Sequence, residues 1–323
     1  MENVLARPRT FGASRTLVQI GALLMLVMLP ALGVLRIDLA RGSLMVLGRL
    51  VNLRDFPVVS GLAIMLATAP LLMISTIGTF WCGWACPQNT VSEWANGLTH
   101  RLLGSRASVD VDGSGLEVAP SKNRIANWIS LVARLVAASL VLGVVPLFYF
   151  FPPDVVWSLV RGGDQDQFSA FIYRLYLVSA GAAFVDIALV RYFLCNYACL
   201  YRIGLYLFRN ERATHIAYDA ARSGECAKCN YCRVSCRTGI DPKLIKKFER
   251  CINCAECVDA CNRLQVRRHG GGPGLLRFES GTPSASGRPA SWVDRARASI
   301  GWHGLLFFGG CALLAYGLGN LPH

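Results

Sequence analysis

Long apolar runs alternate with polar segments along the chain, and they predict membrane-spanning helices. The uncharged runs that are long enough to cross a hydrocarbon core of roughly 30 Å as helices cover residues 17–35, 58–80 and 300–318. Two more runs, 125–151 and 168–194, contain a charge: Arg134 in the first and Asp186 in the second. Aromatic residues flank both where membrane interfaces favour them, so we expect five spans.

The charges of the short loops predict the orientation. Arg7, Arg9 and Arg15 precede the first run, whereas the loop 152–167 carries three aspartates against Arg161 alone. Basic residues favour the cytoplasmic side, although four arginines between residues 36 and 56 count against this assignment. We expect a bacterial inner-membrane protein whose N-terminus and cysteine-rich segment are cytoplasmic, and whose C-terminus is extracytoplasmic.

Composition supports a membrane protein that carries one small soluble module. The 323 residues are 53% hydrophobic and 16% charged. The net charge of +13 comes from basic residues beside the apolar runs, where they orient a membrane protein, so we predict no nucleic-acid partner. Thirteen cysteines in a chain of this length favour metal ligation over a disulfide scaffold.

The dominant motif is a repeated run of four cysteines. Cys226-x2-Cys229-x2-Cys232-x3-Cys236 recurs 25 residues later as Cys251-x2-Cys254-x2-Cys257-x3-Cys261. Three thiolates two residues apart wrap around three irons of a cuboidal cluster, and the fourth comes from the other run in two-cluster ferredoxins. One 4Fe–4S cluster is therefore assigned to Cys226, Cys229, Cys232 and Cys261, and the other to Cys251, Cys254, Cys257 and Cys236. Structural zinc is the alternative.

The residues after the fourth cysteines depart from the usual pattern. Arg237 and Asn262 stand where a proline usually follows. We expect this departure to loosen a turn and to leave the clusters more solvated, without removing a ligand.

Two Cys-x3-Cys motifs form a second candidate site. Cys82 and Cys86 lie at the end of the second predicted span, and Cys195 and Cys199 at the end of the fourth, on the same predicted membrane face. On a helix this spacing puts both thiols on one side. Four such thiols could hold a third cluster, bind copper(I) or cycle as dithiols. The alternative is packing between helices, which is also our interpretation of Cys311.

Arg134 and Asp186 are expected at similar depth in their spans, where they could form an ion pair. A charge inside a membrane is costly unless it is paired, so the pair suggests a proton path beside a quinol site. The equally weighted alternative is a pair that only fixes the packing of the two helices.

With these residues in hand, the chain resembles the cytochrome c oxidase accessory protein family (CcoG, FixG or RdxA), which are bacterial membrane polyferredoxins. The resemblance extends from the first span to about residue 278. Beyond the cysteine motifs, it rests on Trp81-Cys-Gly-Trp-Ala-Cys-Pro-Gln, Phe148-Tyr-Phe, Tyr218-Asp, Thr238-Gly-Ile-Asp, Cys257-Val-Asp-Ala-Cys and Gly274-Leu-Leu-Arg-Phe. Two departures are Leu200 in place of a proline and the expected lack of the family's C-terminal immunoglobulin-like domain.

The resemblance implies a role in assembling a haem-copper oxidase, by reducing copper(II) to copper(I) with electrons from the clusters. The implied partners are the membrane, copper ions or a copper chaperone, and the oxidase assembly machinery. One alternative is a conduit of the NapH or NosR type, which passes electrons from membrane quinol to a partner reductase. Another is a non-catalytic copper-binding assembly factor. Whether the chain is an enzyme, as a cupric reductase would be, stays open here.

The predicted fold is a helical membrane domain with an inserted α+β ferredoxin domain that holds two clusters. The expected divisions are a cytoplasmic N-terminus at 1–16, a four-helix membrane domain at 17–208, a ferredoxin domain at 209–266, a linker at 267–299 and a fifth membrane helix with a short tail at 300–323.

Overall fold

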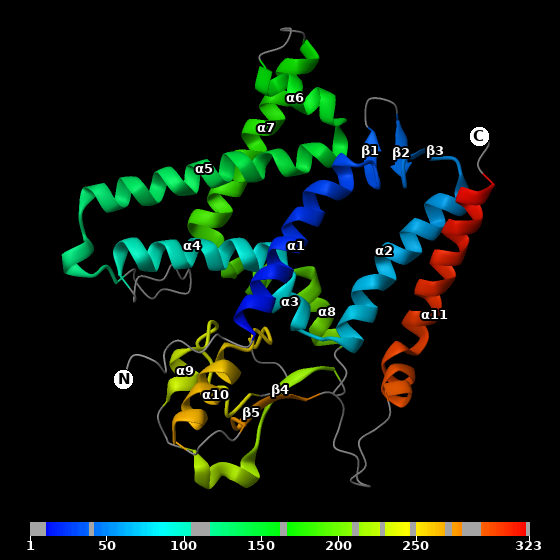
Figure 1. Ribbon diagram of the computed structural model, residues 1–323. Coiled ribbons are helices and arrows are strands. Elements are labelled where there is room, and N and C mark those ends of the chain that lie inside the picture. The colour runs from blue at the N-terminus through cyan, green and yellow to red at the C-terminus, as the bar shows by residue number, and fades with distance from the viewer. Residues whose placement is uncertain are drawn as a thin grey trace. The chain divides into compact units, whose positions relative to one another are not determined.

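The computed structural model describes residues 11–38, 42–104, 117–161, 167–208, 213–226, 230–245, 250–268, 273–279 and 292–320 (Figure 1). The chain divides into two units. The first consists of Met1–Gly21, Gly61–Cys86 and Cys199–Ala312, and the second of Ala22–Ser60, Pro87–Ala198 and Leu313–His323.

Five helices in the described part of the chain are long and apolar enough to cross a membrane, which confirms the predicted number. They are α1 (Gly12–Ala31), α2 (Phe56–Thr76), α5 (Ile125–Phe150), α7 (Gln167–Val185) with the π-helical η3 (Asp186–Val190), and the apolar part of α11 (Trp292–Gly319). The shorter helices are α3 (Phe80–Trp84), α4 (Pro87–Leu103), η2 (Pro120–Lys122), α6 (Pro153–Arg161), η4 (Leu194–Ala198), α8 (Leu200–Phe208), η5 (Ala220–Glu225), α9 (Tyr231–Val234) and α10 (Glu256–Arg268).

Helix α1 ends earlier than the apolar run predicts, because Gly33 caps it. Gly33 has a φ of +70°, and its N–H donates to the carbonyl of Pro30 while the N–H of Val34 donates to that of Leu29. This left-handed cap stops the helix, and the apolar residues beyond it enter a strand instead.

A three-stranded antiparallel meander occupies the segment that was expected to be a loop. Its strands are β1 (Leu35–Asp38), β2 (Ser43–Val46) and β3 (Arg49–Asn52). Val46 and Val51 point inward and are almost fully buried. The strands are only four residues long, and in β1 the charged Arg36 and Asp38 are buried while Ile37 is exposed. Such strands lack the alternation that would predict them, so the sheet was missed.

Close packing in the second unit depends on small residues. The buried positions of α5 recur at every fourth residue, from Leu131 to Leu147. A Cβ on Gly143 would lie only 2.7 Å from the Cα of Ala180 on α7, so the two helices touch backbone to backbone (Figure 1). The amphipathic α4 also packs on α5, through Ala95, Leu98 and Leu103.

The first unit contains the cysteine-rich segment on a small α+β framework. Strands β4 (His215–Tyr218) and β5 (Leu276–Glu279) pair antiparallel, and α10 packs on β5 (Figure 1). The core contains Ile216 and Leu276 together with the cluster-run residues Cys232, Cys257 and Val258. Strand β5 lies inside the segment expected to be a linker from residue 267, so the domain continues beyond the predicted boundary.

Candidate iron–sulfur centres and the Cys-x3-Cys motifs

The 25-residue repeat of the sequence is also a repeat of backbone conformation. Asn230 and Ala255 are 25 residues apart, and both have positive φ, 51° and 66°. Each directly precedes a helix, α9 at Tyr231 and α10 at Glu256. A left-handed residue followed by a helix start turns backbone N–H groups toward one point, as anion-binding nests do. In the described residues, the two runs therefore share a left-handed turn before a helix, and this turn suits a negatively charged group.

Three cysteines of the first set line one pocket. Cys226 and Cys232 of the first run lie there with Cys261 of the second run, beside Tyr218 and Lys243. Cys229 lies outside the described residues. The exchange of the fourth ligand between the runs stays a prediction, and the placement of Cys261 is the one that it requires.

The second cysteine set is gathered around Cys257. Burial raises the pKa of this thiol, and the thiols of Cys254, Cys251 and Cys236 raise it further. The thiol of Cys232, which belongs to the first set, also raises the pKa of Cys257, so the two sets lie next to each other. Burial also raises the pKa of the Cys254 thiol. Metal ligation requires thiolates, so bound iron must replace these protons.

The cysteine residues fit cuboidal clusters better than single ions. In the described ranges, no three side chains of histidine, cysteine, aspartate or glutamate converge closely enough to hold one metal ion. Three thiols of the first set line one pocket, an arrangement that the ligands of a cuboidal cluster also have. The residues that would hold the clusters are the two predicted sets, and a bound 4Fe–4S cluster supplies one-electron redox chemistry.

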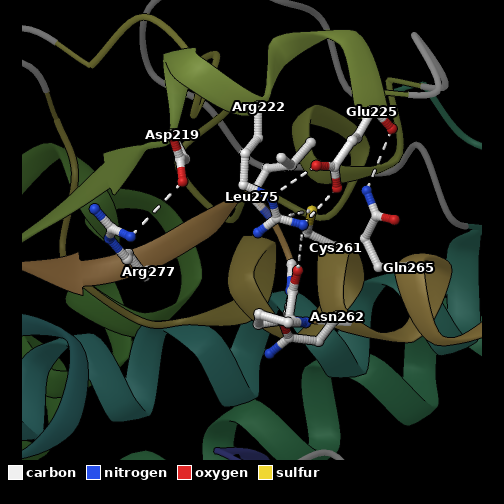
Figure 2. A network of polar contacts seen from close by, with 10 residues as sticks. Asp219, Arg222, Glu225, Cys261, Asn262, Gln265, Leu275 and Arg277 are labelled. Atoms are coloured by element: carbon white, nitrogen blue, oxygen red, sulfur yellow. Dashed lines mark hydrogen bonds and ion pairs between the residues drawn. The ribbon is translucent and has the colours of Figure 1, made fainter. Parts of the chain in front are cut away.

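Backbone and side-chain groups contact the sulfurs directly. The N–H of Leu275 donates to Sγ of Cys261 at 3.3 Å. Figure 2 shows Leu275 and Cys261 together with the ion pairs between Arg222 and Glu225 and between Arg277 and Asp219. Hydrogen bonds to the sulfurs are one of the means by which a protein tunes a cluster's reduction potential.

The two residues that replace the usual prolines make specific contacts rather than loosening their turns. Without a proline, α10 continues through Cys261 to Arg268. Asn262 accepts a hydrogen bond from the N–H of Gly274 at 2.8 Å, and a Cβ on Gly274 would collide with that amide. Arg237 forms an ion pair with Glu256 at 2.8 Å. The expectation of looser turns is therefore wrong.

Three of the four Cys-x3-Cys thiols lie near one tyrosine. Burial raises the pKa of Tyr201, and the thiols of Cys82, Cys199 and Cys86 raise it further. Its hydroxyl donates to the carbonyl of Gly78 at 2.8 Å. All three cysteines are half-buried and belong to the first unit, whereas Cys195 lies in η4 of the second unit. Cys86 and Cys199 each directly precede a helix, α4 and α8.

The first Cys-x3-Cys motif packs directly on the loop of the second cysteine set. A Cβ on Gly83 would lie 2.2 Å from the carbonyl oxygen of Ile252, so only glycine permits this approach. The indole N–H of Trp84 donates to the carbonyl of Asn253 at 3.0 Å. The Trp84 ring stacks on Phe80 at 4.6 Å and closes the core of the ferredoxin-like unit. The two motifs that the sequence analysis treated separately therefore meet.

The predicted ion pair between Arg134 and Asp186 does not form. Arg134 is exposed. It is not one of the buried positions of α5, which recur at every fourth residue and include Leu135. Asp186 instead accepts a hydrogen bond from the side-chain amide of Gln88 at 2.8 Å.

Arg191 is the buried charge that the sequence analysis overlooked. It is 1% exposed, and its guanidinium donates to the carbonyl of Ile187, to Thr99 and to Asn96. It follows η3 with a φ of 41°, so the helix breaks there before η4. Arg174 and Arg191 are both further charges inside the predicted span 168–194, and this signal could have revealed it.

Two family models match the two cysteine-bearing regions. Residues 58–106 match a model described as "4Fe-4S binding domain", and residues 209–281 match one described as "4Fe-4S dicluster domain". No solved structure matches the chain. The matches support the predicted fold class of a helical membrane protein with ferredoxin-type iron–sulfur domains.

Similar proteins are the Nitrogen fixation protein FixG of Rhizobium meliloti (strain 1021) and the Protein RdxA of Cereibacter sphaeroides. The first is 28% identical over 227 residues, which is 65% of this chain and 42% of FixG. The second is 28% identical over 239 residues, 70% of this chain and 49% of RdxA. The chain thus spans about half the length of the curated relatives it matches. These matches confirm the predicted resemblance to FixG- and RdxA-like polyferredoxins and support an iron–sulfur electron-transfer protein of that type.

Proposed function

We propose that electrons pass from the two clusters of the dicluster domain to a redox centre at the Cys-x3-Cys motifs. That centre then reduces copper(II) to copper(I) in support of haem-copper oxidase assembly. The observation that carries the proposal is the contact of Gly83 and Trp84 with the loop Ile252–Asn253, which places a Cys-x3-Cys motif against the second cysteine set.

The short route for an electron follows from that contact. Ile252 and Asn253 lie between the predicted ligands Cys251 and Cys254, and Gly83 follows Cys82 directly. The carbonyl of Ile252 is within contact distance of the Gly83 backbone. One backbone contact and a few covalent bonds therefore connect a cysteine of the second set to a cysteine of the motif.

A third 4Fe–4S cluster is the centre we propose for the motifs. The match to a 4Fe–4S binding domain covers residues 58–106, in which the cysteines are Cys82 and Cys86. A cuboidal cluster commonly takes four thiolates. Cys199 lies near the same tyrosine, and Cys195, its partner in the sequence motif, completes the predicted set. Copper(I) bound by these soft thiolates is the alternative occupant.

The iron content of the purified chain tests the third centre. About twelve irons per chain are expected for three clusters, and about eight for two. Replacing Cys82 and Cys86 by serine should then remove about four irons. Cys311→Ser is the matched control, because that thiol lies in α11, away from both motifs in the sequence. An unchanged count of about eight in every protein would refute the third cluster.

Copper reduction has its own test. One electron leaves a reduced cluster and converts one copper(II) to copper(I), so a copper(I)-specific chelator should report one equivalent for each electron stored. The chain is first reduced with dithionite, and the excess reductant is removed. The double serine variant should lose the reaction, while Cys311→Ser should retain it. Copper(I) formation at the wild-type rate in the double variant would refute the role of the motif.

A second candidate is a conduit that accepts electrons from membrane quinol. The polar group of Gln88, Asp186 and Arg191 at the break between η3 and η4 favours it, because quinol oxidation must release protons. Under this reading a quinol analogue reduces the clusters, and Asp186→Asn slows the reduction. Arg134→Gln is the control, because Arg134 is exposed and does not contact Asp186. An unaffected rate in Asp186→Asn would reject the conduit's proton path.

The two candidates and the assembly factor differ in their acceptors and donors. Reduced protein that transfers electrons to copper(II) supports the first candidate, and reduction of the clusters by quinol supports the second. If neither reaction occurs, the non-catalytic copper-binding factor is the remaining candidate. For all three candidates we propose that the ferredoxin-like domain lies on the cytoplasmic side of the membrane. The positions of the basic residues support this orientation.

A further inference from the structure

Side-chain donors from two separate segments reach the pocket of the first cysteine set. Tyr218, the last residue of β4, and Lys243 line this pocket together with Cys226, Cys232 and Cys261. A hydrogen bond in a partly buried site is electrostatically stronger than one in bulk water. Both side chains are therefore in a position to act on the sulfurs.

A turn holds Lys243 at the pocket. The carboxylate of Asp241 accepts the backbone N–H of Lys243 at 3.0 Å, and the carbonyl of Asp241 accepts the N–H of Leu244 at 3.1 Å. Aspartate commonly stabilises a turn in this way, by bonding to the backbone two residues further on. The turn fixes the position from which the Lys243 side chain extends.

The ammonium group of Lys243 acts on two sulfurs. Its hydrogen bond with Cys226 raises the pKa of Lys243 most, and the charges of Cys226 and Cys232 raise it further, against the opposing effect of burial. Burial raises the pKa of the Cys232 thiol, whereas Lys243 lowers it. Asp241 opposes Lys243 at this thiol, but more weakly. Lys243 therefore favours the thiolates that iron requires.

Tyr218 is a second donor to the sulfur of Cys226. Burial raises the pKa of its hydroxyl, and the charge of Cys226 and a hydrogen bond with that residue raise it further. A phenol that stays protonated at neutral pH can donate to a thiolate. Cys261 accepts the backbone N–H of Leu275 (Figure 2). Donors thus reach at least two of the sulfurs that line the pocket.

We propose that Lys243 and Tyr218 donate hydrogen bonds to the Cys226 sulfur of the first cluster and thereby raise the reduction potential of that cluster. A one-electron reduction adds one negative charge to the cluster. A donor or cation beside a sulfur attracts the reduced state more strongly than the oxidised state. Lys243 supplies a full charge as well as a donor, so its effect exceeds that of Tyr218.

The test is a redox titration of the full chain, followed by electron paramagnetic resonance of the reduced clusters. The first-set component is the signal that Cys226→Ser removes and Cys254→Ser retains. Lys243→Met keeps a long side chain without the charge and the donor, and it should lower the reduction constant of this component by about tenfold, or about 59 mV for a one-electron couple. Tyr218→Phe removes only a hydroxyl and should lower the constant by about threefold.

Two further variants separate this effect from a packing defect. Lys243→Arg keeps the positive charge and should restore most of the lost potential. Lys122→Met is the matched control, because Lys122 is exposed in the second unit and donates to the carbonyl of Arg101. That control should leave both dicluster components unchanged. Each variant measures the contribution of one side chain, since every other charge around the first set stays in place.

The proposal would be overturned if Lys243→Met left the first-set component unchanged or shifted both components equally, or if Lys243→Arg behaved like Lys243→Met. Should Lys243→Met fail to assemble its clusters, Tyr218→Phe decides, and an unchanged potential in that variant refutes the role of the donors. Copper is absent from the titration. A failure of copper reduction would therefore leave the result interpretable.

Discussion

Gly83→Ala is the sharpest test of the electron route. The added Cβ would lie 2.2 Å from the carbonyl oxygen of Ile252, where ordinary contacts begin at 3.4 Å, and 3.2 Å from the N of Cys254. The neighbours are backbone atoms, which cannot rotate away. The two loops must therefore separate by roughly 1.2 Å, at a cost of about 1–3 kcal/mol for overpacking.

A separation of this size should slow electron transfer without removing a ligand. Electronic coupling falls steeply with distance, and ångström-scale misplacement of reacting groups can slow a reaction by roughly 100-fold. We expect copper(I) formation by the reduced protein to slow by roughly 10–100-fold in stopped-flow mixing, with an unchanged iron content.

Gly97→Ala provides the matched control. Nothing lies within 4 Å of a Cβ at that position, which is in the middle of α4. The same substitution there should leave the rate unchanged and contribute about 0.4–1 kcal/mol of stability. If Gly83→Ala transferred electrons at the rate of Gly97→Ala with full iron content, the loop contact would not be the route.

Three further substitutions probe the parts of this arrangement. Trp84→Phe keeps an aromatic ring but leaves the buried carbonyl of Asn253 without its indole donor, so it should lower the free energy of unfolding by about 1–3 kcal/mol in a denaturant titration. Cys261→Ser should remove the same cluster signal as Cys226→Ser; loss of different signals would contradict the exchange of fourth ligands. Arg191→Lys should lower the melting temperature in detergent, because a lysine cannot make the forked hydrogen bonds of the guanidinium.

The sequence predicted those features that arise from local periodicity and spacing. Five apolar runs became five helices, since a run of about twenty apolar residues has few other stable states in a membrane. The repeat at an interval of 25 residues reappeared as two left-handed turns, at Asn230 and Ala255, each before a helix. The end of α1 was misplaced because a single residue, Gly33, decides it against the hydropathy of its neighbours.

The features that were missed depend on contacts between distant residues. The Arg134–Asp186 pair was inferred from equal depth, but depth does not specify which side of a helix faces its neighbour, and Arg134 faces away. The role of Gly83 is invisible in the sequence, because a glycine between two cysteines has no local reason to be small. Position 83 requires a glycine because the carbonyl of Ile252, 169 residues further along the chain, lies against it.

The same distinction explains why Arg237 was misjudged. Compared with the proline that usually follows the fourth cysteine, Arg237 was expected to make its turn less rigid. In the structure it gains a partner in Glu256, which also receives Arg15 from the start of the chain. A substitution that removes a local constraint can thus add a long-range one. The turn that carries Arg237 is therefore held by contacts with residues far away in the sequence, and neighbouring residues alone could not have revealed them.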